Sequence, residues 1–452
     1  MIEEDIIVAL ATPHSENGAI AVIRLSGTGT IRLVNKNINI KLTTKHNHMV
    51  TMCNFYDLKK EKIIDTVMIT VYKQGQSYTK EESIEIACHN SFYIIDKIIK
   101  TLIQQGAHMA SRGEFTKRAY LNGQFDLIQA ESVADIIAAK NATTHNIAMQ
   151  QLNGGLSKKI HVLKNKIKDL ATNVNISIDF QEEDTGYSID KQKILNSITD
   201  IIQYIKTLIQ HFNKGETAKN GLKIAIIGKP NVGKSSLLNA LVKEKRAIVS
   251  DIAGTTRDSI DVTMYIDDIK CIFIDTAGLR DNTTDTIEQE GIKRTKNIIT
   301  QADLIFYVID VNMQEKEYKT DIKIITKQKK DIIMIVNKID LNNNFNYENN
   351  SDNKFYISVK NHIGLQKIKN FIKKKYKIHD NDTIINARHY SLLTHILKKL
   401  EKIKLAFQQD TNLELICDDI NECFHDIGAI TGEETSTDDI LDNIFKNFCI
   451  GK

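Results

Sequence analysis

Short apolar runs, each bounded by polar residues or glycine, stand out in the first quarter of the chain. They cover residues 18–27, 66–73 and 83–88, and runs of this length with such boundaries are typical of strands. Between residues 92 and 103, apolar side chains recur at the spacing of an amphipathic helix. The pattern therefore predicts a mixed α and β domain over residues 1–119.

Long stretches of helical periodicity follow in two places. Apolar residues recur every three or four positions from about residue 125 to 212, and again from about 386 to 448. Helices of this kind bury one apolar stripe, so each segment alone would leave an apolar side exposed. We therefore expect the segments to pack together as one helical bundle domain, formed by residues 120–214 and 379–452.

Between the helical segments the pattern alternates strands with helices, which predicts an inserted α/β domain over residues 215–378. Such alternation is typical of a mostly parallel sheet that is covered by helices on both faces. The chain as a whole is thus predicted to be multidomain, of the α+β and α/β classes. The candidate strands are 222–228, 270–275, 303–310, 331–337 and 355–358, with 258–267 as an edge hairpin.

The composition of the chain sets only broad limits on its domain number, partners and cellular location. With 452 residues the chain exceeds what one core usually organises, and its formal net charge of +3 neither requires nor excludes a nucleic-acid partner. The six cysteines are scattered without a Cys-x-x-Cys pair, which disfavours a disulfide framework or zinc cluster and suits a reducing cytoplasm. Because no run of 18 apolar residues occurs, we expect a cytoplasmic protein without a membrane segment.

A phosphate-binding loop is the first strong chemical signal. Residues 228–235 read Gly-Lys-Pro-Asn-Val-Gly-Lys-Ser, after an apolar strand and before a helix, which is the context that this motif requires. The glycines let backbone N–H groups surround a phosphate at the start of the helix. Lys234 is expected to bridge the β- and γ-phosphates of a nucleotide, and Ser235 to bind Mg²⁺.

Two further segments fit the γ-phosphate end of such a site. Residues 275–278 (Asp-Thr-Ala-Gly) end the next long strand, where Asp275 is expected to hold the metal through water and the Gly278 amide to meet the γ-phosphate. Residues 251–258 are expected to form the switch loop, in which the Thr256 hydroxyl binds Mg²⁺.

The base site is expected at the ends of two later strands. Residues 337–340 read Asn-Lys-Ile-Asp, and the Asp340 carboxylate suits the N1–H and exocyclic amine of guanine. Residues 358–360 (Ser-Val-Lys) are expected to complete the pocket. These motifs together resemble the translation-factor-like class of GTPases and predict a Ras-like P-loop G domain. The predicted GTP contacts are Asn231, Val232, Gly233, Lys234, Ser235, Ser236, Ser250, Asp251, Ile252, Ala253, Gly254, Thr255, Thr256, Asp275, Thr276, Ala277, Gly278, Asn337, Lys338, Asp340, Ser358, Val359 and Lys360.

The residue that orients the attacking water is not given by these motifs. Many GTPases carry glutamine directly after Asp-x-x-Gly, whereas this chain has Leu279, which cannot orient water. Glu288 and Glu290 follow in a polar stretch, and from the residues alone they are equally well explained as a solvated helix start.

Short motifs spread along the whole chain point to one family. They are residues 11–13 (Ala-Thr-Pro), 24–27 (Arg-Leu-Ser-Gly), 112–116 (Arg-Gly-Glu-Phe-Thr), 254–258 (Gly-Thr-Thr-Arg-Asp), 275–280 (Asp-Thr-Ala-Gly-Leu-Arg) and 448–452 (Phe-Cys-Ile-Gly-Lys). Together they resemble the tRNA-modification GTPase MnmE (TrmE) family. The G-domain motifs specify only a superfamily, so the motifs near the two ends of the chain make the resemblance specific.

For hydrolysis, the resemblance implies that two G domains meet across their switch faces and that a potassium ion supplies the charge of an arginine finger. The matching potassium positions are Asn231, Ser250, Ile252 and Thr255, and those for Mg²⁺ are Ser235 and Thr256. The resemblance also makes Glu288 the water-orienting residue, with Lys234 as the second catalytic residue.

For the N-terminal domain, the resemblance implies a homodimer that binds a tetrahydrofolate one-carbon donor, in its 5,10-methylene or 5-formyl form. Arg24 lies in an apolar strand, where a charge is otherwise out of place, although a structural salt bridge is the alternative. Gln124 stands where the family often has a basic residue. Cys449 has a catalytic or tRNA-positioning role by analogy, with simple packing as the alternative. The matching folate positions are Arg24, Glu85, Gln124 and Lys452.

The function implied by the resemblance is a modification of tRNA. The homodimer would act with an FAD- and NADH-dependent flavoprotein of the MnmG (GidA) type, in a heterotetramer. Together they would add an aminomethyl or carboxymethylaminomethyl group to carbon 5 of the wobble uridine of certain tRNAs. The alternative is a ribosome-assembly GTPase that acts as a binding switch. Such a protein usually has a concentrated basic surface, and tetrahydrofolate binding would distinguish the two functions.

Overall fold

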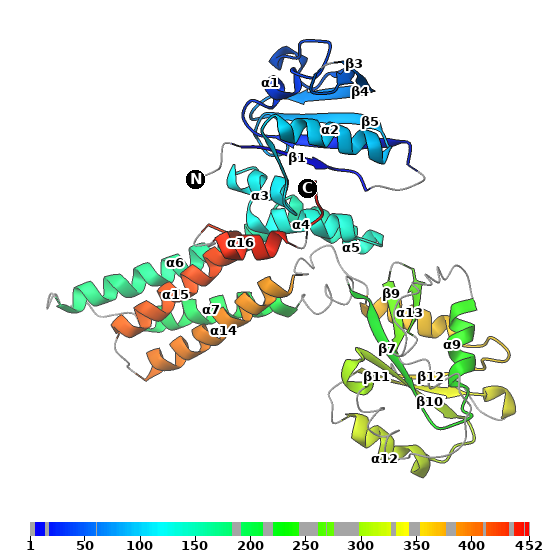
Figure 1. Ribbon diagram of the computed structural model, residues 1–452. Helices are drawn as coiled ribbons and strands as arrows, with labels where there is room; N and C mark the ends of the chain where they lie inside the picture. Colours follow the sequence, from blue (N-terminus) through cyan, green and yellow to red (C-terminus); the bar gives the residue numbers. More distant parts are fainter. Residues whose placement is uncertain are drawn as a thin grey trace. The chain divides into compact units, whose positions relative to one another are not determined.

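The computed structural model divides the chain into two compact units, which Figure 1 shows in ribbon form. Unit 1 comprises Met1–Ala138, Ala148–Ile205 and Ser391–Lys452, and unit 2 comprises Ala139–Ile147 and Lys206–Tyr390. The four-part domain division expected from the sequence stays a prediction. The structure describes residues 5–13, 18–59, 61–182, 191–210, 220–243, 261–267, 269–274, 298–326, 331–342, 353–376, 386–409, 413–433, 438–446 and 448–451.

Unit 1 contains a six-stranded mixed sheet with the strand order β3-β4-β5-β2-β1-β6. All neighbours pair antiparallel except β1 and β6, which are parallel. The three strands expected from the sequence are present as β2, β4 and β5, whereas β1, β3 and β6 were not predicted. The strands are β1 (Ile6–Leu10), β2 (Ile20–Ser26), β3 (Val50–Tyr56), β4 (Ile63–Tyr72), β5 (Ser83–His89) and β6 (Ala107–Met109).

The two faces of this sheet have different surroundings because side chains alternate along each strand. On one face, Ile23 and Leu25 of β2 share a core with Ile31 of α1 (Thr30–Val34) and Ile98 of α2 (Phe92–Gln104). Arg24 lies between Ile23 and Leu25 in β2, so its side chain projects from the opposite face. The charged residue thus does not enter the main core of this domain.

The helices of unit 1 confirm the periodic pattern. Within the first helical stretch, the apolar positions of α6 form a stripe that is at most 1% exposed, made of Leu156, Ile160, Leu163, Ile167 and Leu170. Helix α15 packs along α6, so segments far apart in sequence share one helical core, as expected. Within the parts that the structure describes, no helix combines the length and apolar character needed to cross a membrane. The further helices are η1 (Thr44–His46), α3 (Glu114–Leu121), α4 (Leu127–Ala138), α6 (Gly155–Glu182), α15 (Leu413–Thr431) and α16 (Asp438–Phe445). The boundaries between the two units fall within α5 (Ala142–Leu152), α7 (Lys191–Gln210) and α14 (Ala387–Gln408).

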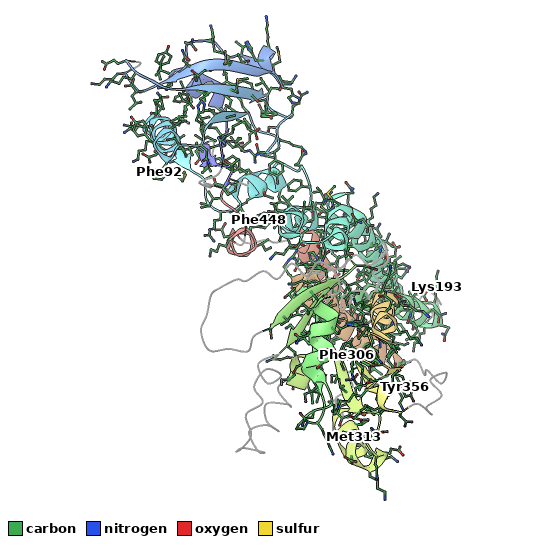
Figure 2. All side chains as sticks on the ribbon, turned by 90° about the vertical axis from the view of Figure 1, so that its right-hand side faces the viewer. Phe92, Lys193, Phe306, Met313, Tyr356 and Phe448 are labelled. Carbon is green, nitrogen blue, oxygen red and sulfur yellow. The ribbon has the colours of Figure 1, made fainter. Side chains whose placement is uncertain are left out.

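Unit 2 is an α/β domain with the strand order β12-β11-β10-β7-β9-β8. Every neighbouring pair is parallel except β8 and β9, which form the expected antiparallel edge hairpin. Phe306 (labelled in Figure 2) and Tyr307 are consecutive in β10 and enter cores on opposite faces, so both faces are covered. The elements are β7 (Leu222–Ile227), α9 (Lys234–Lys243), β8 (Val262–Ile266), β9 (Ile269–Ile274), β10 (Leu304–Asp310), α12 (Glu315–Thr326), β11 (Asp331–Asn337), η2 (Ile339–Leu341), β12 (Lys354–Tyr356) and α13 (Leu365–Tyr376).

Candidate functional sites

The predicted phosphate-binding loop joins β7 to α9 and has a backbone that requires glycine. Gly228 has φ 157°, and a Cβ there would lie 2.2 Å from the carbonyl oxygen of Val308 in β10. Gly233 has φ 96°, and a Cβ there would lie 2.3 Å from Nδ2 of Asn337. Any side chain at these positions would push the loop away from the sheet. The loop therefore keeps its backbone close to the strand ends, with the N-terminus of α9 behind it.

Lys234, the first residue of α9, is held inside this loop. Its Nζ donates to the carbonyl oxygens of Gly228 and Lys229, each at 2.8 Å. Burial lowers the pKa of the Lys234 ammonium, since a low-dielectric environment disfavours the charged form. A phosphate bound within the loop would stabilise the charged form of Lys234 through its negative charge. The geometry therefore suits phosphate binding.

The predicted base-binding motifs converge on the loop although they are far apart in sequence. Asn337, buried at the end of β11, donates from Nδ2 to the carbonyl oxygen of Val232 at 2.9 Å. Its Oδ1 accepts from the backbone N–H of Val359 at 3.2 Å. The Ser358 hydroxyl donates to Oδ1 of Asp340 at 2.5 Å, which fixes the plane of that carboxylate. Asn337 thus links the phosphate loop to the segment that orients Asp340.

Asp310 is a member of this site that sequence reasoning missed. Lys338, in a left-handed conformation with φ 64°, places its Nζ 2.9 Å from Oδ2 of Asp310. The other Asp310 oxygen accepts from the backbone N–H of Asn312 at 3.0 Å. Burial alone would raise the pKa of Asp310, but the Asn312 and Lys338 hydrogen bonds outweigh it and lower the pKa. The available signal was a carboxylate at the carboxyl end of a parallel strand.

Asp310→Asn is expected to weaken GDP binding about two- to fivefold, because it removes a partly exposed ion pair that orients Lys338. Titration with a fluorescent GDP analogue would measure the effect. If Asp310 acts through Lys338, the same substitution should change nothing further in a Lys338→Met background. An equal loss in both backgrounds would contradict this role.

Most of the remaining predicted site residues fall outside the described residues, so their roles stay predictions. Residues 235–236 lie in the first turn of α9, and Asn231 lies at an exposed point of the loop with φ 63°. Lys360 follows Val359 and is exposed. The predicted site residues that lie outside the described ranges are Ser250, Asp251, Ile252, Ala253, Gly254, Thr255, Thr256, Asp275, Thr276, Ala277, Gly278, Glu288 and Lys452.

In unit 1, the structure brings together two of the predicted ligand-binding residues. Arg24 and Glu85 are direct partners across β2 and β5. Nε and Nη2 of Arg24 donate to Oε1 of Glu85 at 3.0 and 2.7 Å. Aromatic rings flank the guanidinium, with the Tyr78 and Phe115 centroids 5.9 and 5.8 Å from its central carbon. The salt bridge considered as the alternative for Arg24 is therefore present, and it lies beside two aromatic rings on the face of the sheet opposite α1 and α2.

Tyr72 and Tyr78 lie beside this pair, and the residue after Gln124 packs near Tyr78. The Tyr72 hydroxyl donates to the second Glu85 oxygen at 3.2 Å, and burial, followed by the Glu85 charge, raises the Tyr72 pKa. Gln124 is exposed in the turn after α3, next to Phe125, whose ring centroid is 5.9 Å from that of Tyr78. The Tyr78 ring therefore lies next to both the Arg24 guanidinium and the Phe125 ring.

Residues 448–451 reach the same side of the sheet. Nη1 of Arg24 donates to the carbonyl oxygen of Gly451 at 3.2 Å, and the Cys449 carbonyl accepts from the Gly113 N–H at 3.4 Å. Phe448 is anchored in a small core with Phe445. Cys449 itself is exposed, which argues against packing as its role.

These features define a class of protein: a P-loop GTPase with a Ras-like, mostly parallel sheet, joined to a second unit that carries the Arg24–Glu85 pair. Family models for the "MnmE helical domain" and the "GTP-binding protein TrmE N-terminus" match residues 127–449 and 6–124. The chain therefore belongs to the tRNA modification GTPase MnmE family.

Full-length relatives agree with this assignment. Proteins named tRNA modification GTPase MnmE from Flavobacterium johnsoniae and Cytophaga hutchinsonii are 42% and 41% identical to the chain. The matches cover 100% of the chain and 100% of the first relative, and 99% and 98% for the second. The solved G domain of the T. maritima FeoB iron transporter matches 35% of this chain and 99% of that one, at 25% identity, but the TM-score of 0.27 adds no argument.

Proposed function

We propose that this protein is a GTP hydrolase that drives modification of carbon 5 of the wobble uridine in certain tRNAs. The product would carry an aminomethyl or carboxymethylaminomethyl group, and the partner would be an FAD- and NADH-dependent flavoprotein of the MnmG type. The observation that carries the proposal is that Lys234, Asn337 and Asp340 converge at the carboxyl ends of the parallel strands, in a chain of this family. The proposed division is an N-terminal folate-binding and dimerisation domain (1–119), a G domain (215–378) and a two-part helical domain (120–214 and 379–452).

The residues available for metal ions suit hard cations. Ser235 and Thr256 would bind Mg²⁺, and all of their ligand atoms are oxygens, as Mg²⁺ requires. Asn231, with an exposed side chain at the loop, would join Ser250, Ile252 and Thr255 around K⁺. The cations would neutralise charge that develops on the phosphate oxygens. Lys234 would bind the β- and γ-phosphates, while Glu288 would orient the attacking water.

We propose the Arg24–Glu85 pair as the centre of a tetrahydrofolate site, completed by Gln124 and Lys452. A folate has an aromatic ring system with hydrogen-bonding edges and a glutamate tail that carries carboxylates. The fit rests on an arginine and a carboxylate that are 20% and 28% exposed beside Tyr78 and Phe115. Gln124 can donate a hydrogen bond to a carboxylate but cannot neutralise it.

Arg24→Gln is expected to lower the affinity for 5-formyltetrahydrofolate by about 10- to 100-fold, because a charge-assisted hydrogen bond contributes about 1.5–3 kcal/mol. Isothermal titration calorimetry would measure the change, with Lys97→Gln on α2 as a control of the same charge. Wild-type affinity in the Arg24 variant would place the folate elsewhere. No binding to the wild type would instead favour the ribosome-assembly alternative.

The proposed function as a whole is tested in a bacterium that lacks its own such GTPase. Expression of the wild type should restore the wobble-uridine modification, measured by mass spectrometry, whereas Lys234→Ala should not. Absence of the modification despite comparable amounts of protein, and with the flavoprotein from the same source supplied, would contradict the proposal.

A further inference from the structure

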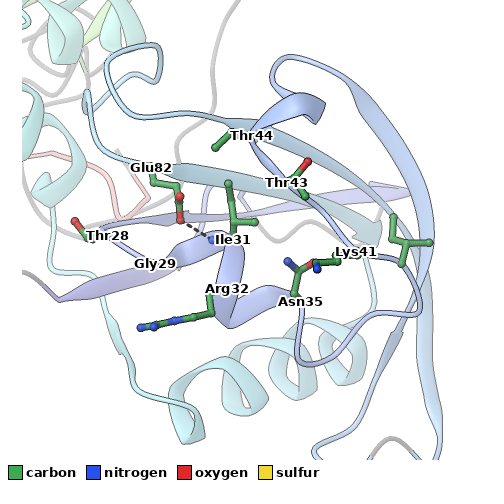
Figure 3. Close-up of a pocket in the computed structure, with 10 residues that line it drawn as sticks. Thr28, Gly29, Ile31, Arg32, Asn35, Lys41, Thr43, Thr44 and Glu82 are labelled. Carbon is green, nitrogen blue, oxygen red and sulfur yellow. Dashed lines mark hydrogen bonds between the residues drawn. The ribbon is translucent and has the colours of Figure 1, made fainter.

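A hollow of about 840 Å³ lies beside α1 in unit 1, apart from both sites described above (Figure 3). Its lining includes Arg32 of α1, Lys41 and Thr44 from the segment that follows, and Glu82 before β5. Helix α1 covers the face of the sheet that carries Ile23 and Leu25, whereas Arg24 projects from the other face. The sheet therefore separates this hollow from the Arg24–Glu85 pair.

The backbone around the hollow is fixed by side chains. Asn35 donates from Nδ2 to the Leu42 carbonyl oxygen and accepts from the Leu42 N–H, each at 2.8 Å. Glu82 accepts from the Ile31 N–H at 2.7 Å, which is the dashed line in Figure 3. These bonds hold α1 and the segment after it in place. The hollow is thus part of the folded domain, with a volume in the range of small-molecule sites.

The charged side chains of this segment have no partner within the described parts of the chain. Arg32, Lys36, Lys41 and Lys45 are all exposed, and none of the four side chains makes a hydrogen bond or ion pair there. By contrast, exposed Lys100 and Lys319 pair with acidic residues one helical turn away. A protein surface usually intersperses both signs of charge, so a run of basic side chains without acidic partners leaves a positive surface that can attract a polyanion.

The sequence around these residues explains why they lack partners. Residues 17–56 contain five Lys or Arg residues and no Asp or Glu, although the whole chain has 57 acidic residues. The fifth basic residue, Arg24, pairs with Glu85. Glu82 is the carboxylate that lines the hollow, and one of its oxygens already accepts from Ile31. The α1–η1 surface, defined as residues 28–48, therefore carries four basic side chains, and among the described residues Glu82 is the one carboxylate in the lining of its hollow.

We propose that the α1–η1 surface binds the phosphate backbone of RNA, with one nucleotide seated in the hollow between Arg32 and Lys41. Four cations spread over residues 32–45 suit a polymer with regularly spaced phosphates better than a single small anion. The Thr28 and Thr44 hydroxyls can bond phosphate or ribose oxygens, and the second Glu82 oxygen can accept from a ribose hydroxyl. The inference rests on the proposed function, and it adds the surface by which the protein holds its tRNA.

The test is binding of a tRNA transcript to the full chain, measured by fluorescence anisotropy between about 50 and 200 mM salt. Each phosphate contact contributes about 0.7–0.9 to the slope of log affinity against log salt. Arg32→Gln with Lys41→Gln should therefore make the slope shallower by about 1.4–1.8 and weaken binding about 25- to 60-fold at ~0.1 M salt. Lys62→Gln with Lys97→Gln removes the same charge from exposed positions outside the surface and should leave the slope unchanged.

The outcomes separate this inference from the proposed function. If the wild type binds tRNA and the Arg32/Lys41 variant matches the Lys62/Lys97 control, the inference is overturned and the proposed function stands. If the wild type does not bind tRNA, both are overturned. If millimolar inorganic phosphate displaces the labelled tRNA as well as unlabelled RNA does, the hollow binds a free anion and the inference is overturned. GTP hydrolysis at the wild-type rate would show that the variant is folded, and Lys36→Gln with Lys45→Gln provides a second test on the same surface.

Discussion

Asp340→Asn is expected to lower the affinity for GDP by about 10⁴-fold, the largest binding effect that the structure suggests. The carboxylate would accept from the N1–H and the exocyclic amine of guanine, and asparagine replaces one acceptor by a donor. Because the Ser358 hydroxyl donates to Oδ1 at 2.5 Å, the asparagine should keep its carbonyl oxygen there and present its amide nitrogen to the base. That nitrogen would face donors of guanine, which leaves buried polar groups unpaired.

The same geometry predicts a gain for another base. Xanthine carries a carbonyl oxygen where guanine carries the exocyclic amine, so the Asp340→Asn variant should prefer xanthosine diphosphate to GDP. Equilibrium titration with both nucleotides would measure the preference, with Asp310→Asn as a control that should still prefer guanine. Unchanged GDP affinity in the Asp340 variant would mean that another group reads the base.

Glu288→Ala is expected to slow GTP hydrolysis by about 10²- to 10⁴-fold while GTP binding stays near normal. Leu279 occupies the position from which glutamine orients water in many GTPases, so the reaction depends on another polar group. A residue that acts only on the attacking water should affect kcat, whereas nucleotide affinity is expected to depend on the phosphate loop and Asp340. Glu288 lies outside the described residues, so this prediction rests on the sequence and the family.

Single-turnover hydrolysis in the presence of K⁺ and Mg²⁺ would test this role, together with a nucleotide-binding titration. Glu290→Ala is the matched control, because it removes the same charge two residues further along the chain. Unchanged turnover in the Glu288 variant would remove that residue from the mechanism. Equal losses in both variants would indicate an effect of charge in the segment, not a role for one carboxylate.

The strands that the sequence predicted are those with an unmistakable local pattern. β7, β10 and β11 are predominantly apolar, as a parallel sheet buried on both faces requires, and β7 and β11 lead directly into motifs of the predicted site. β3 was missed because its pattern is irregular: Val50 and Met52 are exposed, so polar and apolar positions do not alternate cleanly. Its place at the edge of the sheet results from pairing with β4, which the sequence of β3 alone does not encode.

By itself, the sequence determined the phosphate loop and the direction of the strands around it. The loop is local: glycines at positions 228 and 233 permit a backbone that other residues cannot adopt, and the helix that follows supplies N–H groups to the same short segment. Motifs of this kind can be recognised from the sequence alone, because the residues that form the site are neighbours along the chain.

Only the tertiary structure decided which distant groups meet. Arg24 contacts Glu85 and the Gly451 carbonyl, which are 61 and 427 residues away along the chain. The Lys338–Asp310 pair likewise depends on β10 and β11 lying side by side in one register. Sequence assigns a charge to each of these positions, but strand register and the packing of remote segments decide whether that charge is paired, free or aimed at a ligand.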